Sequence, residues 1–283
     1  MKQIVFISGK GGTGKSTLVS SLCQLVDNKM LADCDVDAPN LHILLNEKRF
    51  ENDEYFGTKE AVIDRDKCTE CGICRQVCRF DALNENFEII PFRCEGCGAC
   101  MIACPAQAIS LKDVKTGNVY ASHTNVGTFS HALLDIGAEG SGKLVTQVRK
   151  SVTKHEKDED WLIIDGSPGI GCAVIASITG ADAVVAVAEP TKSGISDLQR
   201  VLDVAKFFDI KSFVCINKYD LNSEITEEIE DYCEENDIEV IGKIPFEPKI
   251  VYALQEFKTP VDAGLTNIVE EIKNIWKKLS SQV

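Results

Sequence analysis

A short glycine-rich loop near the N-terminus constrains the fold of this chain more than any other feature. The loop is Gly9-Lys-Gly-Gly-Thr-Gly-Lys-Ser16, which fits G-x-x-x-x-G-K-[ST], and it lies between an apolar run at Gln3–Ser8 and a helical pattern at Lys15–Val26. Glycines at these places let backbone N–H groups turn toward a phosphate, and the N-terminus of the following helix adds partial positive charge. The sequence therefore predicts a buried strand, a phosphate-binding loop and a helix in direct succession.

Two side chains of this loop have individual predicted roles. The ammonium group of Lys15 is expected to reach the β- and γ-phosphates, and the hydroxyl of Ser16 is expected to bind Mg²⁺. The loop therefore predicts a nucleoside triphosphate and Mg²⁺ as cofactors. The residues predicted to line the phosphates are Gly9, Lys10, Gly11, Gly12, Thr13, Gly14, Lys15, Ser16 and Thr17.

Short apolar runs and helical patterns alternate along most of the chain. Further runs typical of buried strands are Leu31–Asp35, Trp161–Asp165, Ala183–Ala188, Ser212–Asn217 and Glu239–Ile244, and further helical patterns are Asp197–Phe208, Glu224–Glu235 and Ile268–Leu279. Strands that alternate with helices predict an α/β domain, with a mostly parallel sheet flanked by helices. The last helix is expected to pack on the core.

Cysteine is concentrated in one segment. Eight of the thirteen cysteines lie between Cys68 and Cys104, in two runs that each have the spacing C-x₂-C-x₂-C-x₃-C. This spacing is typical of bacterial ferredoxins with two [4Fe–4S] clusters, in which the fourth cysteine of each run ligates the other cluster. The predicted ligand sets are Cys68, Cys71, Cys74 and Cys104 for one cluster, and Cys94, Cys97, Cys100 and Cys78 for the other. Zinc is the alternative metal, but two complete four-cysteine runs favour iron–sulfur clusters.

The two runs also overlay as an internal repeat with an offset of 26 residues, from Cys68 to Cys94. The simplest interpretation is a small ferredoxin-like α+β domain at residues 64–112, inserted into the α/β domain. The α/β domain is then discontinuous and consists of residues 1–63 and 113–283.

Charge and hydropathy exclude several classes of protein. The net charge is −14, which argues against non-specific binding to nucleic acid. No apolar run approaches the ~20 residues that a membrane span needs, and we expect a cytoplasmic protein. Acidic residues crowd the segment from Leu221 to Val240, which predicts a solvated helix face or, alternatively, a docking surface for a basic partner.

The early lysine of the loop, Lys10, carries a family resemblance. The string Lys10-Gly-Gly-Thr-Gly-Lys-Ser-Thr17 resembles the deviant loop of the MinD, ParA and nitrogenase iron-protein superfamily of P-loop ATPases. The resemblance implies an ATP-sandwich dimer, either a homodimer or a heterodimer with a related ATPase. In such a dimer Lys10 would reach the partner's nucleotide.

Two aspartate-bearing segments that follow predicted strands extend this resemblance. Asp33-Cys-Asp-Val-Asp-Ala-Pro-Asn40 resembles switch I, which implies that Asp35 positions the attacking water, a task that Asp37 could share. Asp165-Gly-Ser-Pro-Gly-Ile-Gly-Cys172 resembles switch II, which implies that Asp165 binds Mg²⁺ through water. Cys172 resembles a cysteine that holds an interfacial cluster in the nitrogenase iron protein, so a third cluster is a further hypothesis.

The resemblance also assigns the base-binding residues. It implies that Asn217 contacts the base and that the backbone around Pro245 lines the adenine. The string Asn217-Lys-Tyr-Asp220 is similar to the guanine-binding N-K-x-D of GTPases as well, so GTP remains an alternative to ATP.

Together these features predict an ATPase that couples its nucleotide state to electron transfer through two [4Fe–4S] clusters. The alternatives are an iron–sulfur or metallocofactor assembly ATPase and, third, a positioning ATPase like MinD or ParA. The expected partner is a redox or metallocofactor protein. Similar chains are often labelled cobyrinic acid a,c-diamide synthase, but that activity needs a glutamine amidotransferase domain for which the rest of the chain is too short.

Overall fold

The computed structural model describes residues 1–283 and divides into two compact units. The larger unit comprises residues 1–53, 119–133 and 140–283. The cysteine-rich unit comprises residues 54–118 and 134–139. Residues 64–112 lie within this unit, and their assignment as an inserted ferredoxin-like domain stays a prediction.

The secondary structure alternates strand and helix, as the sequence predicts for the larger unit. The elements are β1 (Lys2–Ser8), α1 (Lys15–Leu25), β2 (Lys29–Asp33), α2 (Leu41–Leu44), β3 (Lys48–Ile63), α3 (Ile73–Val77), α4 (Ala99–Ala103), β4 (Ile109–Thr124), β5 (Gly127–Leu134), α5 (Gly142–Thr153), β6 (Trp161–Pro168), α6 (Cys172–Ile178), β7 (Ala183–Ala188), α7 (Lys192–Phe207), β8 (Lys211–Asn217), a 3₁₀ turn (Tyr219–Leu221), α8 (Ser223–Glu235), β9 (Glu239–Ile244), α9 (Lys249–Gln255) and α10 (Thr266–Ser280).

All nine strands belong to one sheet. Its order is β3-β4-β5-β2-β6-β1-β7-β8-β9, and β1 pairs in parallel with both β6 and β7. The pairs β2–β5, β2–β6, β7–β8 and β8–β9 are parallel as well. Parallel strands end at the same edge of the sheet, so the residues that follow β1, β2, β6 and β8 gather there. The prediction of an α/β fold with a mostly parallel sheet is confirmed for the larger unit.

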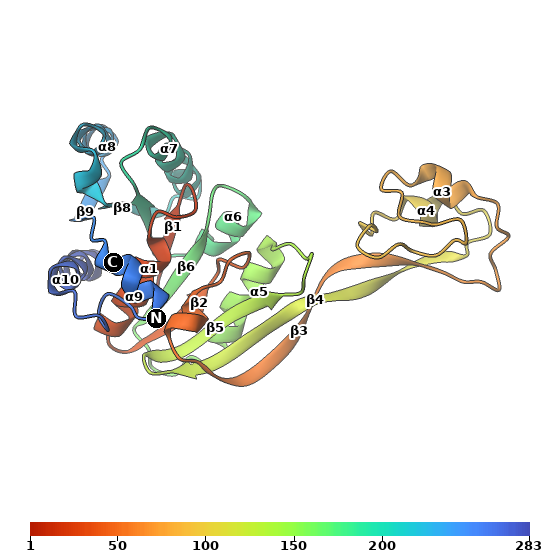
Figure 1. Cartoon of the computed structure of the whole chain (residues 1–283), viewed down its shortest axis with the longest axis horizontal. Coiled ribbons are helices and arrows are strands. Elements are labelled where there is room, and N and C mark those ends of the chain that lie inside the picture. The colour runs from red at the N-terminus through yellow and green to blue at the C-terminus, as the bar shows by residue number, and fades with distance from the viewer. The chain divides into compact units, whose positions relative to one another are not determined.

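Helices cover both faces of this sheet, with α1 and α10 on one face and α5, α6 and α7 on the other (Figure 1). Ile4 and Phe6 of β1 pack in one apolar cluster with Leu22 of α1 and Ile272 of α10, and all four side chains are buried. The intervening residue Val5 is buried too. Because both faces are covered, the central strands are continuous apolar runs, which is why the sequence reveals them. The predicted packing of the C-terminal helix on the core is confirmed.

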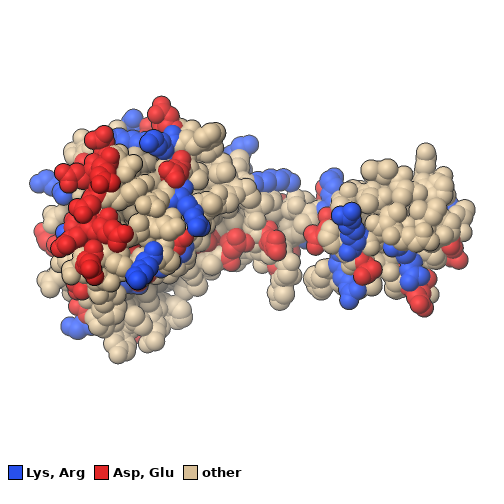
Figure 2. Space-filling view, turned by 90° about the horizontal axis from the view of Figure 1, so that it is seen from above, with Lys and Arg blue, Asp and Glu red and all other residues tan.

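The acidic segment is a solvated helix face. Helix α8 buries Ile225, Ile229 and Cys233 against the unit, while most of its carboxylates are exposed. Acidic side chains gather at the end of the larger unit where α8 lies in Figure 1 (Figure 2). None of the helices combines the length and the apolar character that crossing a bilayer requires.

The cysteine-rich unit repeats its local structure as it repeats its sequence. Helices α3 and α4 each have five residues and each follow a glycine with φ of 78°, Gly72 and Gly98. This left-handed conformation is one that glycine adopts at little cost. The buried core of the unit is small and consists of Ala61, Cys74, Leu83 and Ile109.

Candidate nucleotide-binding site

The glycine-rich loop connects β1 to α1, as predicted. Gly12 and Gly14 have φ of 82° and 91°, in the left-handed region. A Cβ atom on Gly14 would lie 2.2 Å from Nδ2 of Asn217, so only glycine fits there. That amide group donates a hydrogen bond to the Thr13 carbonyl at 2.7 Å. Asn217, predicted to contact the base, thus braces the phosphate loop directly, and its contact with a base stays a prediction.

Lys15 lies at the centre of a buried charge cluster. Its Nζ is 2.5 Å from Oδ1 of Asp165 and 3.6 Å from Oδ2 of Asp35. The Ser16 hydroxyl is 3.5 Å away from the same nitrogen. Burial disfavours the charged ammonium, but the carboxylates of Asp165 and Asp35 outweigh it and raise the pKa of Lys15. The structure therefore brings together four residues that the sequence predicts to bind phosphate, Mg²⁺ or the attacking water.

One oxygen of this cluster lacks a partner. Oδ2 of Asp165 accepts no hydrogen bond from the protein, and because the side chain is fully buried, bulk water does not reach it either. A buried, unpaired carboxylate oxygen is costly, and native structures tolerate one mainly where a ligand completes it. A divalent cation with its water shell fits this requirement, since carboxylate and hydroxyl oxygens are preferred Mg²⁺ ligands.

Asp33 is a functional residue for which the sequence analysis predicted no separate role. Its carboxylate is buried and accepts the backbone N–H groups of Asp35, Asn40 and Leu41 at 3.0–3.1 Å. Burial, reinforced by the negative charge of Asp165, raises the pKa of Asp33 to about 8. Asp33 therefore shapes the segment that carries Asp35. Its position at the end of β2, two residues before Asp35, was the available signal.

An open cavity of about 600 Å³ lies over this cluster, within the size range of small-molecule sites. Its lining combines the glycine-rich loop with Asp35, Asp37, Gly140 and Cys172. The Gly140 N–H donates to Oδ1 of Asp37 at 2.8 Å, which connects the predicted switch I to the segment before α5. Cys172 is exposed, whereas Cys23, Cys34, Cys215 and Cys233 are buried.

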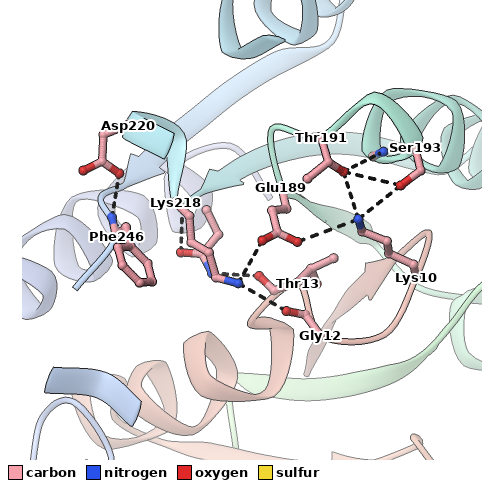
Figure 3. Close-up of polar contacts among 11 residues, drawn as sticks. Lys10, Gly12, Thr13, Glu189, Thr191, Ser193, Lys218, Asp220 and Phe246 are labelled. Atoms are coloured by element: carbon pink, nitrogen blue, oxygen red, sulfur yellow. Dashed lines mark hydrogen bonds and ion pairs between the residues drawn. The ribbon is translucent and has the colours of Figure 1, made fainter. Parts of the chain in front are cut away.

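A second, apolar cavity adjoins the loop on its other side. It is lined by Gly12, Gly14, Asn217, Lys218, Ile244, Pro245 and Phe246, among others. The Phe246 N–H donates to Oδ1 of Asp220 at 2.7 Å (Figure 3). Pro245 has no N–H group, so the wall at these two residues offers no free backbone donor.

The Lys10 side chain contacts residues of its own subunit, beside the N-terminus of α7. Its Nζ is 2.9 Å from the Thr191 hydroxyl, 3.3 Å from the Ser193 hydroxyl and 3.8 Å from Oε2 of Glu189 (Figure 3). Lys218 pairs with the other oxygen of Glu189 at 2.9 Å. No sequence motif marks Glu189, Thr191 or Ser193, and only their position after β7 indicated that they face the same edge of the sheet.

The eight predicted cysteine ligands line two separate cavities of the cysteine-rich unit. One cavity is lined by Cys68, Cys71, Cys74 and Cys104, and the other by Cys78, Cys94, Cys97 and Cys100. Burial raises the pKa values of Cys74 and Cys100, and in each case the neighbouring thiols add to the shift. No group of three or more His, Cys, Asp or Glu side chains is arranged to hold a single metal ion.

The fold and the buried lysine–aspartate cluster at the end of its first strand define a P-loop nucleotide-binding protein. The family model of the CobQ/CobB/MinD/ParA nucleotide binding domain matches residues 4–261, and the chain belongs to this family.

Several relatives and solved structures are similar to the chain. An uncharacterized protein of Methanocaldococcus jannaschii is 32% identical over 224 residues, 78% of this chain and 79% of that protein. A second uncharacterized protein of that organism is 29% identical over 98% of both chains. The pyruvate synthase subunit PorD of Methanothermobacter marburgensis is 34% identical over 58 residues, 20% of this chain and 72% of that subunit.

Among solved structures, the cell division protein MinD of Aquifex aeolicus has a TM-score of 0.58 at 20% identity. The superposition covers 99% of this chain and 97% of that one. The septum site-determining protein MinD of Pyrococcus horikoshii, complexed with Mg-ADP, has a TM-score of 0.59 at 17% identity, over 98% of this chain and 95% of that one. At these identities the likeness shows the fold alone.

Proposed function

We propose that the chain is an ATPase that dimerises when ATP is bound. Its cysteine-rich unit is proposed to carry electrons. The observation that carries the ATPase is the buried cluster of Lys15, Asp35 and Asp165, with one carboxylate oxygen unpaired. Two carboxylates and a lysine at the mouth of a phosphate loop are the groups that hydrolysis of a phosphoanhydride needs.

Each residue of the cluster has a separate task in this proposal. Lys15 leaves the carboxylates and pairs with the β- and γ-phosphates. Ser16 and the unpaired oxygen of Asp165 would hold Mg²⁺, directly and through water respectively, and a bound Mg²⁺ would supply positive charge beside the phosphates. Asp35 orients the attacking water. Partial burial raises the pKa of Asp35, which makes its carboxylate a better proton acceptor.

The apolar cavity beside the loop supports adenine over guanine. The wall at Pro245 and Phe246 offers no free backbone N–H group. The O6 atom of guanine is an acceptor and finds no backbone donor there, whereas the exocyclic amino group of adenine is itself a donor and needs none. Asp220, which could read guanine in an N-K-x-D motif, already accepts the Phe246 N–H.

Two variants test the ATPase. Lys10→Ala is expected to bind ATP yet hydrolyse it poorly, because the contact to the partner's nucleotide is missing. Asp35→Ala is expected to bind ATP and to accumulate as a dimer, measured by analytical ultracentrifugation. Hydrolysis by Lys10→Ala at the wild-type rate would contradict the proposed dimer.

The cysteine-rich unit is proposed to hold two [4Fe–4S] clusters, which take up and release single electrons. Three observations support this proposal. Each cavity has four thiols, and in each the fourth comes from the other run. The Ala82 N–H points at Sγ of Cys78, and the Ala108 N–H at Sγ of Cys104, both at 3.4 Å. Such N–H···S contacts stabilise thiolate ligands and tune cluster potential. The short similarity to a subunit of pyruvate synthase is consistent with a redox role.

A cluster assembly ATPase is the second candidate. Cys71 and Cys97, one in each cavity, are exposed, so a cluster held there is open to transfer. Anaerobic reconstitution tests the clusters first: about eight irons and eight sulfides per chain are expected. Zinc without visible absorbance would contradict the proposal.

Redox-poised EPR of the nucleotide-free protein and of the ATP-bound Asp35→Ala dimer then separates the two candidates. Coupling of about 1–3 kcal/mol would shift the cluster potential by roughly 40–130 mV. Equal potentials, with clusters lost to an acceptor protein on turnover, would favour assembly.

A further inference from the structure

Lys10 has an unexpected set of partners. In this single chain the lysine is held by the Thr191 and Ser193 hydroxyls and, more distantly, by Glu189. Thr191 is the N-cap of α7 and Ser193 belongs to its first turn. The N-terminus of a helix carries partial positive charge and repels an ammonium group. The position of Lys10 therefore depends on Glu189, the only carboxylate that pairs with it.

Glu189 does not serve Lys10 alone. Its Oε1 atom accepts the Lys218 ammonium at 2.9 Å, while Lys10 lies 3.8 Å from Oε2. Lys218 in turn approaches the Gly12 carbonyl at 3.5 Å and follows Asn217, which braces Thr13. One mostly buried carboxylate therefore joins a lysine of the phosphate loop to a lysine beside the base cavity, and the pair with Lys218 is the shorter one (Figure 3).

Each partner of Lys10 keeps a second partner when Lys10 leaves. The Thr191 hydroxyl also accepts the Gly194 N–H at 3.0 Å, and Glu189 remains paired with Lys218. Release of Lys10 thus leaves no buried charge or acceptor without a partner, which is the main cost of breaking a buried ion pair. The arrangement holds Lys10 in a defined place and lets it go at low cost.

We propose that Glu189 is a positioning residue for Lys10: anchored by Lys218, its carboxylate holds Lys10 on its own subunit until the phosphates of a nucleotide-bound partner take the lysine over. This inference rests on the proposed ATP-dependent dimer. It adds that the hold opposes dimerisation, so that Glu189 sets the protein concentration at which the dimer forms.

The test is the dimerisation midpoint of Glu189→Gln in a non-hydrolysable ATP analogue, measured by analytical ultracentrifugation. Glutamine keeps the shape and removes the charge. The protein concentration at the midpoint is expected to fall by about two- to fivefold for each lysine released. This is the fold-change that corresponds to the free energy of one partly exposed ion pair. At about 1 M salt the difference is expected to vanish, because the charges are screened. The matched control is Glu230→Gln on α8, which breaks a pair of 2.9 Å with Lys243 of β9.

The decisive measurement repeats Glu189→Gln in a Lys10→Ala background. If Glu189 acts through Lys10, the substitution no longer shifts the midpoint there. A shift that persists would mean that Glu189 acts through Lys218 and the loop, and would overturn the inference. An unchanged midpoint in the otherwise wild-type chain would overturn it as well. A wild-type chain that stays monomeric with the analogue would overturn the proposed dimer itself, and the inference with it.

Discussion

The two units of the chain differ in what fills their interiors. The larger unit buries continuous apolar strands, such as Ile4–Ile7 and Ala183–Ala188, between two layers of helices. The cysteine-rich unit buries few apolar side chains, and its small core is surrounded by partly buried Cys78, Cys94, Cys100 and Cys104. In the cysteine-rich unit, thiols make up much of the interior that leucine and valine side chains fill in the larger unit.

This difference predicts two relations between ligand and fold. Small domains bury too little apolar surface to be stable alone and depend on metals or disulfides instead. If the cysteine-rich unit binds the proposed clusters, they are part of its fold, whereas a nucleotide would bind to a larger unit that is already folded. Four experiments test this contrast.

The largest expected effect is on the cysteine-rich unit when its metal is removed. Amide hydrogen exchange protection between residues 64 and 112 should be lost, while the strands of the larger unit stay protected. Cys78→Ala and Cys104→Ala should each damage the cluster held mainly by the other run. Cys233→Ala, which removes a cysteine of α8 in the larger unit, is the control. Equal protection with and without metal would show that the cysteine-rich unit folds without it.

In the larger unit, the largest effect is expected from Lys15→Ala. The change removes the cation for the phosphates and leaves Asp165 buried without its partner at 2.5 Å. Breaking a buried pair in this way costs about 3–5 kcal/mol of stability. Calorimetry should detect no tight ATP binding. Lys258→Ala, which breaks an exposed pair with Glu256, should change neither property. Tight binding by Lys15→Ala would contradict the site.

The larger unit should also lose stability in mild acid because of His131. Burial outweighs the attraction of Glu47, 2.8 Å away, and lowers the pKa of His131 to about 4. The unfolded chain takes up this proton near pH 6.5, so stability falls as the pH drops from about 6.5 to about 4, by on the order of 3 kcal/mol. Glutamine does not titrate, so thermal unfolding of His131→Gln should show a flatter profile in that window. Identical slopes would exclude His131 as the cause.

The smallest effect is expected at the base. Asp220→Ala frees the Phe246 N–H, which can then donate to O6 of guanine. We expect the preference for ATP over GTP to fall by about five- to tenfold, the size of one net hydrogen bond. Competition between the two nucleotides measures it. Asp231→Ala, on the solvated face of α8, is the control. Loss of GTP binding with ATP binding unchanged would instead show that Asp220 reads guanine directly.

The sequence missed two kinds of element: largely buried ones such as β5 and α5, and ones exposed to solvent such as β3. Strand β3 carries the charged pattern Lys48-Arg-Phe-Glu-Asn-Asp-Glu-Tyr55, and most of its side chains are exposed. No apolar run marks such a strand, because its order comes from pairing with β4. Helix α7 begins five residues before the predicted Asp197, since the Thr191 side chain accepts the Gly194 N–H and caps it there.

Sequence patterns were enough to identify the features that depend on neighbouring residues: most of the buried strands, the glycine-rich loop and the spacing of the cysteines. Each depends on residues adjacent in the chain, so a pattern reveals it. Which distant groups meet could be seen only in the folded chain. Lys15 lies between Asp35 and Asp165, Asn217 braces Thr13, and Glu189 joins Lys10 to Lys218. These contacts arise because parallel strands end at one edge of the sheet, and the strand order that brings them together is not written in any local pattern.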